Sequence, residues 1–355
     1  MAAKVVLCLF GGQSSEHQVS CMSAAFVVSK LRETPSFDVL TCGISHDGRW
    51  LLTTATAEAI AAEQWEQHPD NRRLLFTPDA TDAHFYVMEN EALTPLDVDV
   101  VFPVLHGKNG EDGTMQGLFD LAGIPYVGCG TLASAVAMDK DIAKRVFATA
   151  GIAQLNYLTV RQHERVKKDT QIREDINKRI GYPCFVKPAN AGSSVGVSKV
   201  KSEAQLAKAM DEAFLHDRKI LVEQASSGRE IEVSVYGADG HVFVSVAGEI
   251  KPGQEFYDYN AKYDDPNSTL IIPAELDADS YARIVDMATR AFNVAECRGL
   301  CRADYFVESS QIYLNEINTM PGFTGISMYP KLMEYSGTNG RDLVYGLVNI
   351  ALQEE

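Results

Sequence analysis

Polar and apolar residues alternate along two neighbouring stretches near the end of the chain, LCRADYFV and QIYLNEIN, with the turn-forming residues ESS between them. Alternation with a period of two is typical of strands, so this pattern predicts an antiparallel hairpin with one apolar and one polar face. Side chains two residues apart on a strand share a face. Arg302 and Asp304 are therefore predicted to point the same way, as are Glu316 and Asn318 on the partner strand.

The polar face of this hairpin has the composition of a metal and anion site. Two carboxylates and an amide oxygen are hard ligands of the kind that hold Mg²⁺ together with substrate phosphates. An arginine beside them can neutralise an anion that develops during a reaction. The alternative is an ordinary hairpin with a solvated face. The continuation TMPGFTGIS favours a site, because it turns at Pro321 and Gly322 and brings a loop of small residues next to the polar face.

Continuous apolar runs in the first third of the chain predict strands of a parallel sheet. KVVLCLF, DVLTCGIS and VDVVFPVLHG are such runs, and the first leads through a glycine turn into a helical pattern. Ligands of parallel sheets bind beyond the carboxyl ends of the strands, where Glu16 and His106 fall. Each has a structural alternative, since an acid also stabilises a helix start and a lone histidine is often structural. No G-x-G-x-x-G follows the first strand, and residues 60–95 are weakly patterned.

The middle of the chain predicts a loop that can cover phosphates. A helix carrying Asp139, Lys140 and Lys144 precedes an apolar strand, which delivers Lys187 into a loop rich in glycine and serine, ANAGSSVG. The N–H groups and hydroxyls of such a loop can bind phosphates, although ordinary hairpin turns have a similar composition. The loop joins two strands, so it is not a P-loop, which opens a helix.

Two acids and an aromatic segment follow. Glu223 ends one predicted strand and Glu230 begins the next, where carboxylates either accept hydrogen bonds from adenine and ribose or are ordinary surface acids. The aromatic and acidic segment EFYDYNAKY is typical of neither a core nor a linker, and we interpret it as a lid that carries Lys262 and Tyr263. Helices are predicted over SYARIVDMATRAFNVAE and RDLVYGLVNIALQEE.

Composition narrows the class of protein. With 355 residues, 46% of them hydrophobic, the chain can form two or three domains with substantial cores. A net charge of −16 argues against binding to nucleic acid or to anionic membranes. The seven cysteines include no C-x-x-C pair, so they indicate neither a disulfide framework nor a zinc site. The first apolar run is too short for a signal segment or a membrane span, which predicts a cytoplasmic protein.

Several motifs in this order resemble those of the ATP-grasp superfamily and, within it, of the D-alanine–D-alanine ligase family. They are GGQSSEHQVS, LHGKNGEDGTMQG, MDK, VKPANAGSSVGVSKV, VEQ with a glutamate seven residues on, FYDYNAKY, RADYF and NEINTMPGFTGIS. The resemblance implies an α/β and α+β ATP-grasp fold with a parallel-sheet, Rossmann-like N-terminal domain. It also implies three domains, over residues 1–120, 121–224 and 225–355.

The resemblance further assigns residues to the nucleotide and the metal. Those implied to bind ATP are Lys140, Lys187, Ser193, Ser194, Glu223, Glu230 and Lys262, the lysines at the phosphates and the two glutamates at adenine and ribose. Those implied to hold two Mg²⁺ ions, or Mn²⁺ in their place, are Asp304, Glu316 and Asn318. Ala225 and Ser226 depart from the pattern, because some relatives have bulkier apolar residues there.

A second set is implied to handle the substrates. Glu16 would receive the ammonium of the first D-alanine, with His106 near its carboxylate. Ser193 and Tyr263 would be hydrogen-bonding partners of Glu16 that tie the loop and the lid together. Arg302 and the backbone N–H of Gly322 would form the oxyanion site. Ser327 would help to hold the carboxylate of the second substrate.

The activity implied is ATP-dependent ligation of two D-alanines through an acyl phosphate, for peptidoglycan precursor synthesis and so for building the cell wall and maintaining cell shape. The family suggests a homodimer. Tyr263 predicts a dipeptide rather than an ester product, because relatives that make esters with D-lactate depart from this lid pattern. One alternative is another ATP-grasp carboxylate–amine ligase, such as a glutathione-synthetase-like enzyme. Another is a nucleotide-binding regulatory module without catalysis, which would not need the complete polar face of the hairpin.

Overall fold

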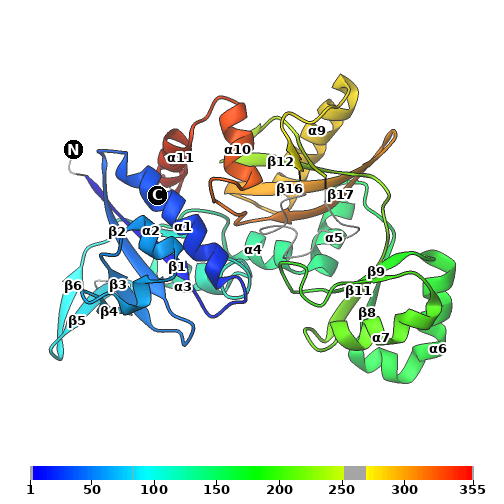
Figure 1. Ribbon diagram of the computed structural model, residues 1–355, viewed down its shortest axis with the longest axis horizontal. Helices are drawn as coiled ribbons and strands as arrows, with labels where there is room; N and C mark the ends of the chain where they lie inside the picture. Colours follow the sequence, from blue (N-terminus) through cyan, green and yellow to red (C-terminus); the bar gives the residue numbers. More distant parts are fainter. Residues whose placement is uncertain (1–2, 83, 252–268, 354–355) are drawn as a thin grey trace.

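The structure, a computed structural model, describes residues 3–82, 84–251 and 269–353 (Figure 1). Its strands form three sheets, of seven, four and six strands. In Figure 1 the first sheet lies at the left in blue and cyan, the second at the lower right in green, and the third between them towards the top. Within the described residues, no helix combines the length and the apolar character needed to cross a membrane.

The first sheet has a parallel centre and an antiparallel extension. β1 (Lys4–Gly11) lies between β2 (Phe37–Ile44) and β7 (Val100–Pro103) and pairs with both in parallel. Four further strands extend the sheet from β2, all antiparallel: β3 (Trp50–Thr53), β4 (Arg72–Phe76), β5 (Phe85–Glu89) and β6 (Ala92–Leu96). The predicted parallel strands are confirmed, and the sheet as a whole is mixed.

Residues 60–95, in which we saw little pattern, have regular structure. After α2 (Ala57–Ala61), the short helix η1 (Trp65–Gln67) buries Trp65 completely, with its ring 5.1 Å from that of Phe10. Strands β4, β5 and β6 follow, each of five residues. Strands this short at the outer edge of a sheet give only a weak period-two signal.

Both faces of β1 lie in apolar cores, which explains its continuous apolar run. Val6, Cys8 and Phe10 pack in the core with α1 (His17–Arg32) and α11 (Gly340–Leu352). Leu7 and Leu9 pack on the opposite face with α3 (Thr114–Ala122). The last helix of the chain therefore returns to the first sheet, as Figure 1 shows.

The second sheet is a small antiparallel layer covered by two helices. Its strand order is β10 (Ser198–Val200), β9 (Cys184–Pro188), β11 (Lys219–Gln224) and β8 (Tyr157–Arg161). α6 (Gln162–Arg179) and α7 (Glu203–Ala213) share its apolar core. The predicted loop of glycine and serine joins β9 to β10, at the edge of this sheet.

The third sheet is antiparallel. It is built from β15 (Thr269–Ile271), β14 (Gly248–Lys251), β12 (Arg229–Ala238), β16 (Gly299–Glu308) and β17 (Gln311–Asn318), with β13 (His241–Val244) paired to β12. Its core is shared with α4 (Thr131–Met138), α5 (Lys140–Thr149) and α9 (Ala278–Val294). α10 (Met328–Tyr335) follows β17 and contacts β12. The division of the chain at residues 120 and 224 stays a prediction.

The predicted hairpin is formed by β16 and β17. Arg302 is paired with Asn318, and Asp304 with Glu316, in the antiparallel register. The opposite face carries buried apolar residues, among them Ala303 at 0% exposure. The period-two pattern therefore predicted both the strands and the side chains that share a face.

Candidate active site

A cleft of about 720 Å³ lies where elements of all three sheets meet. Its lining contains the predicted site residues that the structure describes: Glu16, His106, Lys140, Lys187, Ser193, Ser194, Glu223, Glu230, Arg302, Asp304, Glu316, Asn318, Gly322 and Ser327. Lys262 and Tyr263 lie outside the described residues. Side chains from distant parts of the sequence thus converge on one cavity of the size that small ligands occupy.

Arg302 is held at the floor of the cleft by carboxylates from two strands. Its Nε and Nη2 donate to the two carboxylate oxygens of Asp304, each at 2.7 Å. Its Nε also lies 3.0 Å from a carboxylate oxygen of Glu232, which is paired with Asp304 on β12. Burial opposes the charge of Arg302, but the two carboxylates outweigh it and raise the pKa of the guanidinium. The guanidinium of Arg302 therefore carries a permanent positive charge, and its orientation is fixed by these contacts.

The three predicted metal ligands lie on this same face. Asn318 donates from Nδ2 to Asp304 at 3.0 Å, which leaves its amide oxygen for another partner. Glu316 is directly opposite Asp304, and its carboxylate lies 3.8 Å from the Lys140 ammonium. Two carboxylates and an amide oxygen fit a hard divalent cation such as Mg²⁺.

At the side of the cleft formed by the second sheet, a buried carboxylate lies between two lysines. Glu223 is 1% exposed, and its carboxylate contacts Lys187 through one oxygen and Lys144, at 2.5 Å, through the other. Burial would raise the pKa of this carboxyl, but the charges of Lys144 and Lys187 prevail and lower it to about 2. Apolar side chains such as Met138, Phe185 and Phe306 line the same cleft. Apolar side chains beside fixed polar groups are suited to binding a purine ring.

The loop between β9 and β10 reaches from the second sheet to the first. Ser193 and Ser194 have φ values of +48° and +58°, a left-handed conformation that turns the loop over the cleft. The Ser193 hydroxyl donates to the Glu16 carboxylate, and Lys140 donates to the Ala191 carbonyl at 2.8 Å. The loop predicted to cover ATP and the residue predicted to bind the amino acid are thus in direct contact.

Glu16 precedes α1, yet its side chain does not cap that helix. The carboxylate is 8% exposed and lies so close to Gly107 that a Cβ there would be 2.1 Å from its Oε2. Ser14 holds the backbone of Glu16 next to that of His106, because its hydroxyl donates to the His106 carbonyl at 2.9 Å and accepts from the Glu16 N–H at 3.1 Å. The carboxylate is therefore held at the cleft rather than used to stabilise the helix start.

His106 uses both ring nitrogens inside the protein. Nδ1 donates to the Met320 carbonyl at 2.9 Å, so Nε2 accepts from the Ser23 hydroxyl at 3.0 Å. The Ser23 oxygen in turn accepts from the Phe323 N–H at 3.1 Å. Burial lowers the pKa of His106 and so favours the neutral ring. In this geometry His106 positions the segment that carries Gly322.

The comparisons with known proteins agree over nearly the whole chain. Family models described as "D-ala D-ala ligase N-terminus" and "D-ala D-ala ligase C-terminus" match residues 5–129 and 146–349. The D-alanine--D-alanine ligase of Caldicellulosiruptor bescii is 47% identical over 352 residues, which are 98% of this chain and 95% of that protein. That of Heliobacterium modesticaldum is 46% identical, over 99% of this chain and 95% of the relative. The chain belongs to the D-alanine–D-alanine ligase family.

Solved structures confirm the predicted ATP-grasp fold of this ligase family. The VanG D-Ala:D-Ser ligase from Enterococcus faecalis superposes with a TM-score of 0.88 at 36% identity, covering 98% of this chain and 99% of the other. The D-alanine-D-alanine ligase from Coxiella burnetii gives a TM-score of 0.85 at 32% identity, covering 99% and 94%. The chain is thus an ATP-dependent ligase of this family, and a glutathione-synthetase-like enzyme is set aside.

Two residues that line the ligase cleft, Glu111 and Glu232, escaped the sequence analysis as site residues, and so did Lys144, which contacts Glu223. The sequence analysis placed Lys144 on a helix without assigning it a role. It did not distinguish Glu232 from the other polar positions of its strand. Glu111 lies within the quoted motif KNGEDG and accepts from the Gly107 N–H at 2.7 Å and the Met320 N–H at 3.4 Å. Burial, and then the charge of Glu16, raise its pKa to about 8. Its position beyond the carboxyl end of β7 was a usable signal.

At the far end of the ligase cleft, Ser327 precedes α10. Its hydroxyl accepts from the Thr324 N–H at 3.1 Å and lies 2.7 Å from the Thr324 hydroxyl. The same residue stands at the N-terminus of a helix, where unpaired N–H groups favour a carboxylate. Ser327 can therefore take part in binding a carboxylate while its loop stays ordered.

Proposed function

We propose that this chain joins two D-alanines to D-alanyl-D-alanine at the expense of ATP, as a step of peptidoglycan precursor synthesis. The observation that supports this most is the contact of Ser193 with Glu16, which brings the phosphate-covering loop against the amino-acid pocket. A carboxylate bound near Glu16 would therefore lie next to the terminal phosphate of a nucleotide under that loop.

We assign ATP to the side of the cleft that faces the second sheet. Glu223 and Glu230 would accept hydrogen bonds from adenine and ribose, and Lys144 and Lys187 keep Glu223 ionised for that role. Lys140, Lys187, Ser193, Ser194 and, in the lid, Lys262 would contact the phosphates. Asp304, Glu316 and Asn318 would hold Mg²⁺, which supplies charge neutralisation at the phosphates when bound.

The first half-reaction would activate a carboxylate. Glu16 receives the ammonium of the first D-alanine and so aims its carboxylate at the γ-phosphorus, and a new C–O–P linkage forms as ADP leaves. His106 would act by positioning the segment of Gly322. Ser193 and Tyr263 would close the loop and the lid over this acyl phosphate and keep water away from it.

The second half-reaction would form the amide. Ser327 and the N-terminus of α10 would hold the carboxylate of the second D-alanine, whose free amine attacks the acyl carbon. Negative charge then builds on the carbonyl oxygen, and Arg302 and the Gly322 N–H would stabilise it until phosphate leaves. Arg302 is suited to this role because two carboxylates already fix its direction.

The second substrate is the point at which relatives differ, since one structural neighbour at 36% identity is a D-Ala:D-Ser ligase. We therefore propose incubating the protein with ATP, Mg²⁺ and D-alanine, alone or with D-serine, D-lactate or L-alanine, and identifying the products by mass. ADP release with D-alanyl-D-alanine as the main product is expected, with no efficient ester formation at neutral pH. A D-alanyl-D-serine product in preference would reassign the second site, and ATP binding without any ligation would favour a regulatory module.

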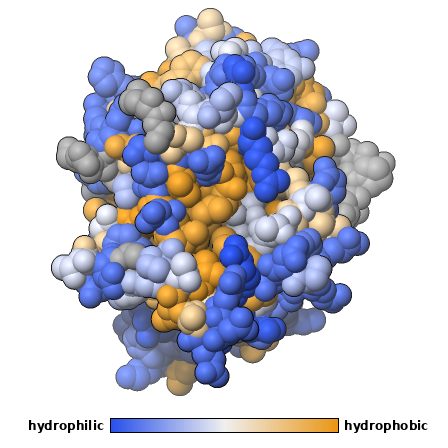
Figure 2. Space-filling model, turned by 90° about the vertical axis from the view of Figure 1, so that its left-hand side faces the viewer, coloured by the Kyte–Doolittle hydropathy of each residue, from blue (hydrophilic) through white to orange (hydrophobic). Residues whose placement is uncertain are grey.

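We also propose that the ligase works in the cytoplasm, where ATP is available, as a homodimer. The face of the N-terminal part seen in Figure 2 supports a contact between copies, because hydrophobic residues gather at its centre within a hydrophilic rim. Light scattering on the purified protein is expected to give twice the chain mass, and a monomer at all concentrations would contradict the dimer.

A further inference from the structure

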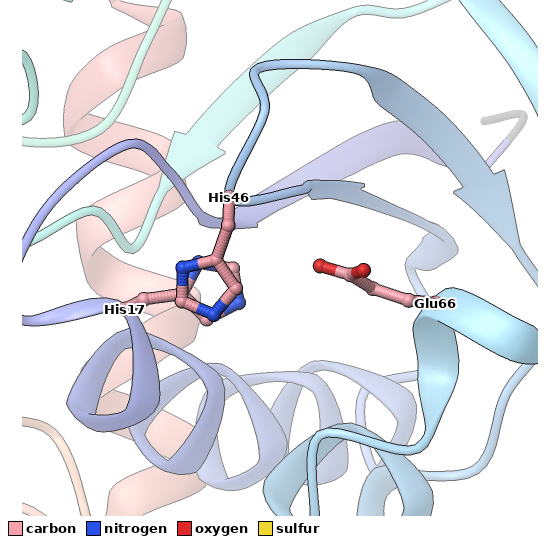
Figure 3. Close-up of side chains that lie close together, drawn as sticks. All are labelled: His17, His46 and Glu66. Carbon is pink, nitrogen blue, oxygen red and sulfur yellow. The ribbon is translucent and has the colours of Figure 1, made fainter.

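A cluster of histidine and glutamate side chains lies outside the cleft and includes His17, the residue that follows Glu16. It is formed by His17 at the start of α1, His46 in the turn after β2, and Glu66 in η1 (Figure 3). One ligand atom from each lies within 4.8 Å of the others. We propose that these three side chains bind a divalent transition-metal ion of the Zn²⁺ class.

His17 is prepared to be a ligand. Its side chain is 3% exposed, and its Nδ1 donates to the Gly12 carbonyl at 2.8 Å. A carbonyl can only accept, so Nε2 carries the lone pair. An imidazole whose second nitrogen donates to a backbone carbonyl is the usual arrangement of metal-ligating histidines.

The carboxylate of Glu66 in the cluster, and that of Glu63 beside it, each have an oxygen placed to interact with a cation. The Oε1 atom of Glu66 is buried and makes no hydrogen bond within the described residues. An oxygen of Glu63 lies 4.0 Å from Nε2 of His17 and 3.9 Å from Nε2 of His46, beyond hydrogen-bond reach of either. A cation placed among these atoms would give the carboxylates and the imidazoles a common partner.

Binding of one ion by both histidines requires one side-chain movement. The two imidazole rings are stacked with centroids 3.8 Å apart and planes at 21°, and parallel rings cannot both direct a lone pair at one ion. The side chain of His46 is 67% exposed and free to turn, whereas that of His17 is packed. Zinc requires ligand distances of about 2 Å, and the proposal requires that His46 rotate towards Glu66 to meet them.

A second grouping shares His17 and consists of Cys21, one turn further along α1, and Glu63. Burial raises the pKa of the Cys21 thiol to about 12, and a thiol must lose its proton to bind zinc. The set with His46 and Glu66 needs no such deprotonation. An ion there would pin the start of α1, next to Glu16, to the turn after β2 and to η1.

The test is zinc titration of the metal-free, full-length protein against a chromophoric chelator, without ATP or amino acid. Excess Mg²⁺ is included to occupy the carboxylates of β16 and β17. One Zn²⁺ per chain is expected, and His46→Ala and Glu66→Gln should each weaken its binding at least about 10-fold. The matched surface variants His163→Ala and Glu58→Gln should bind zinc as the parent does.

A second readout is the spectrum of the Co²⁺-loaded protein, which is expected to show a tetrahedral nitrogen and oxygen site that His46→Ala abolishes. Zinc binding that is absent, or unchanged in both His46→Ala and Glu66→Gln, would overturn the proposal. An intense thiolate-to-cobalt band would overturn the ligand set in favour of Cys21. None of these outcomes depends on the ligase activity, so failure here leaves the proposed function standing.

Discussion

At the scale of single residues, the side chain on which the proposed chemistry depends most is Arg302. Its guanidinium is fixed by Asp304 and Glu232, so in the proposed reaction it would meet a developing oxyanion without reorganising. We expect Arg302→Ala to lower turnover by about 10²–10³-fold, with a smaller effect on ATP binding. Steady-state kinetics measures this, with the exposed Arg341→Ala as the control. Unchanged turnover would remove the oxyanion role.

Glu232 contacts Arg302, so in the proposed reaction we expect it to act by positioning that guanidinium. We expect Glu232→Gln to lower turnover by about 10-fold while the KM for ATP stays close to that of the parent. Because both residues serve one interaction, the double variant Glu232→Gln/Arg302→Ala should be no slower than Arg302→Ala alone. Additive losses in this cycle would show that Glu232 has a separate function.

Glu111 makes stability depend on pH. Its pKa in the folded protein is about 8 against 4.5 for the free group, because burial and then the charge of Glu16 raise it by more than the Gly107 and Met320 N–H groups and the charge of Arg302 lower it. The folded state therefore holds this proton more tightly, and stability that is complete at acid pH is lost as the pH rises through about 8.

Glu111→Gln mimics the protonated group and should remove this part of the slope, at most about 3 kcal/mol of unfolding free energy between pH 6 and pH 9. Denaturant unfolding at pH 6 and pH 9 measures it, with the exposed Glu212→Gln as the control. Equal slopes in the parent and in Glu111→Gln would refute the raised pKa.

At the scale of elements, the loop between β9 and β10 approaches Glu16 closely, and in the proposed reaction this contact would couple the nucleotide to the amino acid. A Cβ on Gly192 would lie 2.8 Å from the Glu16 carboxylate oxygen. We expect Gly192→Ala to displace Glu16 and to raise the KM for the first D-alanine by about 10-fold or more, and that for ATP less. Gly117→Ala is the matched control, because a Cβ there meets its nearest atom at 3.6 Å. Equal increases for both substrates would argue against a specific contact.

The local sequence pattern predicted some elements and side-chain positions well, and it missed others for a physical reason. The strands of the hairpin and the side chains that share its polar face were predicted, because one face is a core and the other a site, which favours alternation. Which residues pair across the two strands was not predicted, and the register shifts between Asp304 and Tyr305. Lys144 and Glu232 gave no such signal, since their partners Glu223 and Arg302 lie far along the chain. Glu111 had a signal in its position beyond the carboxyl end of β7, which the sequence analysis did not use. His106 was placed at the cleft correctly, but its partners Ser23 and Met320 belong to other elements and could not be inferred from the motif.

At the scale of the whole molecule, the site exists only where the three sheets meet. Periodicity predicts strands but not which sheets adjoin, so the cleft itself was inferred from the resemblance of many motifs in order. The mixed first sheet shows the same limit, because β4 to β6 are held by pairing with each other and with β3 rather than by a strong apolar pattern. The return of α11 to the first sheet is likewise a tertiary contact that its own sequence does not encode locally.

Because the proposed nucleotide and metal ligands come from two sheets and from α5, Mg·ADP should stabilise the whole molecule. We expect ADP with Mg²⁺ at 100 times its dissociation constant to add about 2.7 kcal/mol to the unfolding free energy. Omitting Mg²⁺, or replacing Asp304 by Asn, should remove most of the gain in thermal unfolding. Glu66→Gln is the control, since it alters the proposed zinc site and should leave the Mg·ADP effect intact. An equal gain with and without Mg²⁺ would show that the carboxylates of β16 and β17 do not hold the metal of the nucleotide.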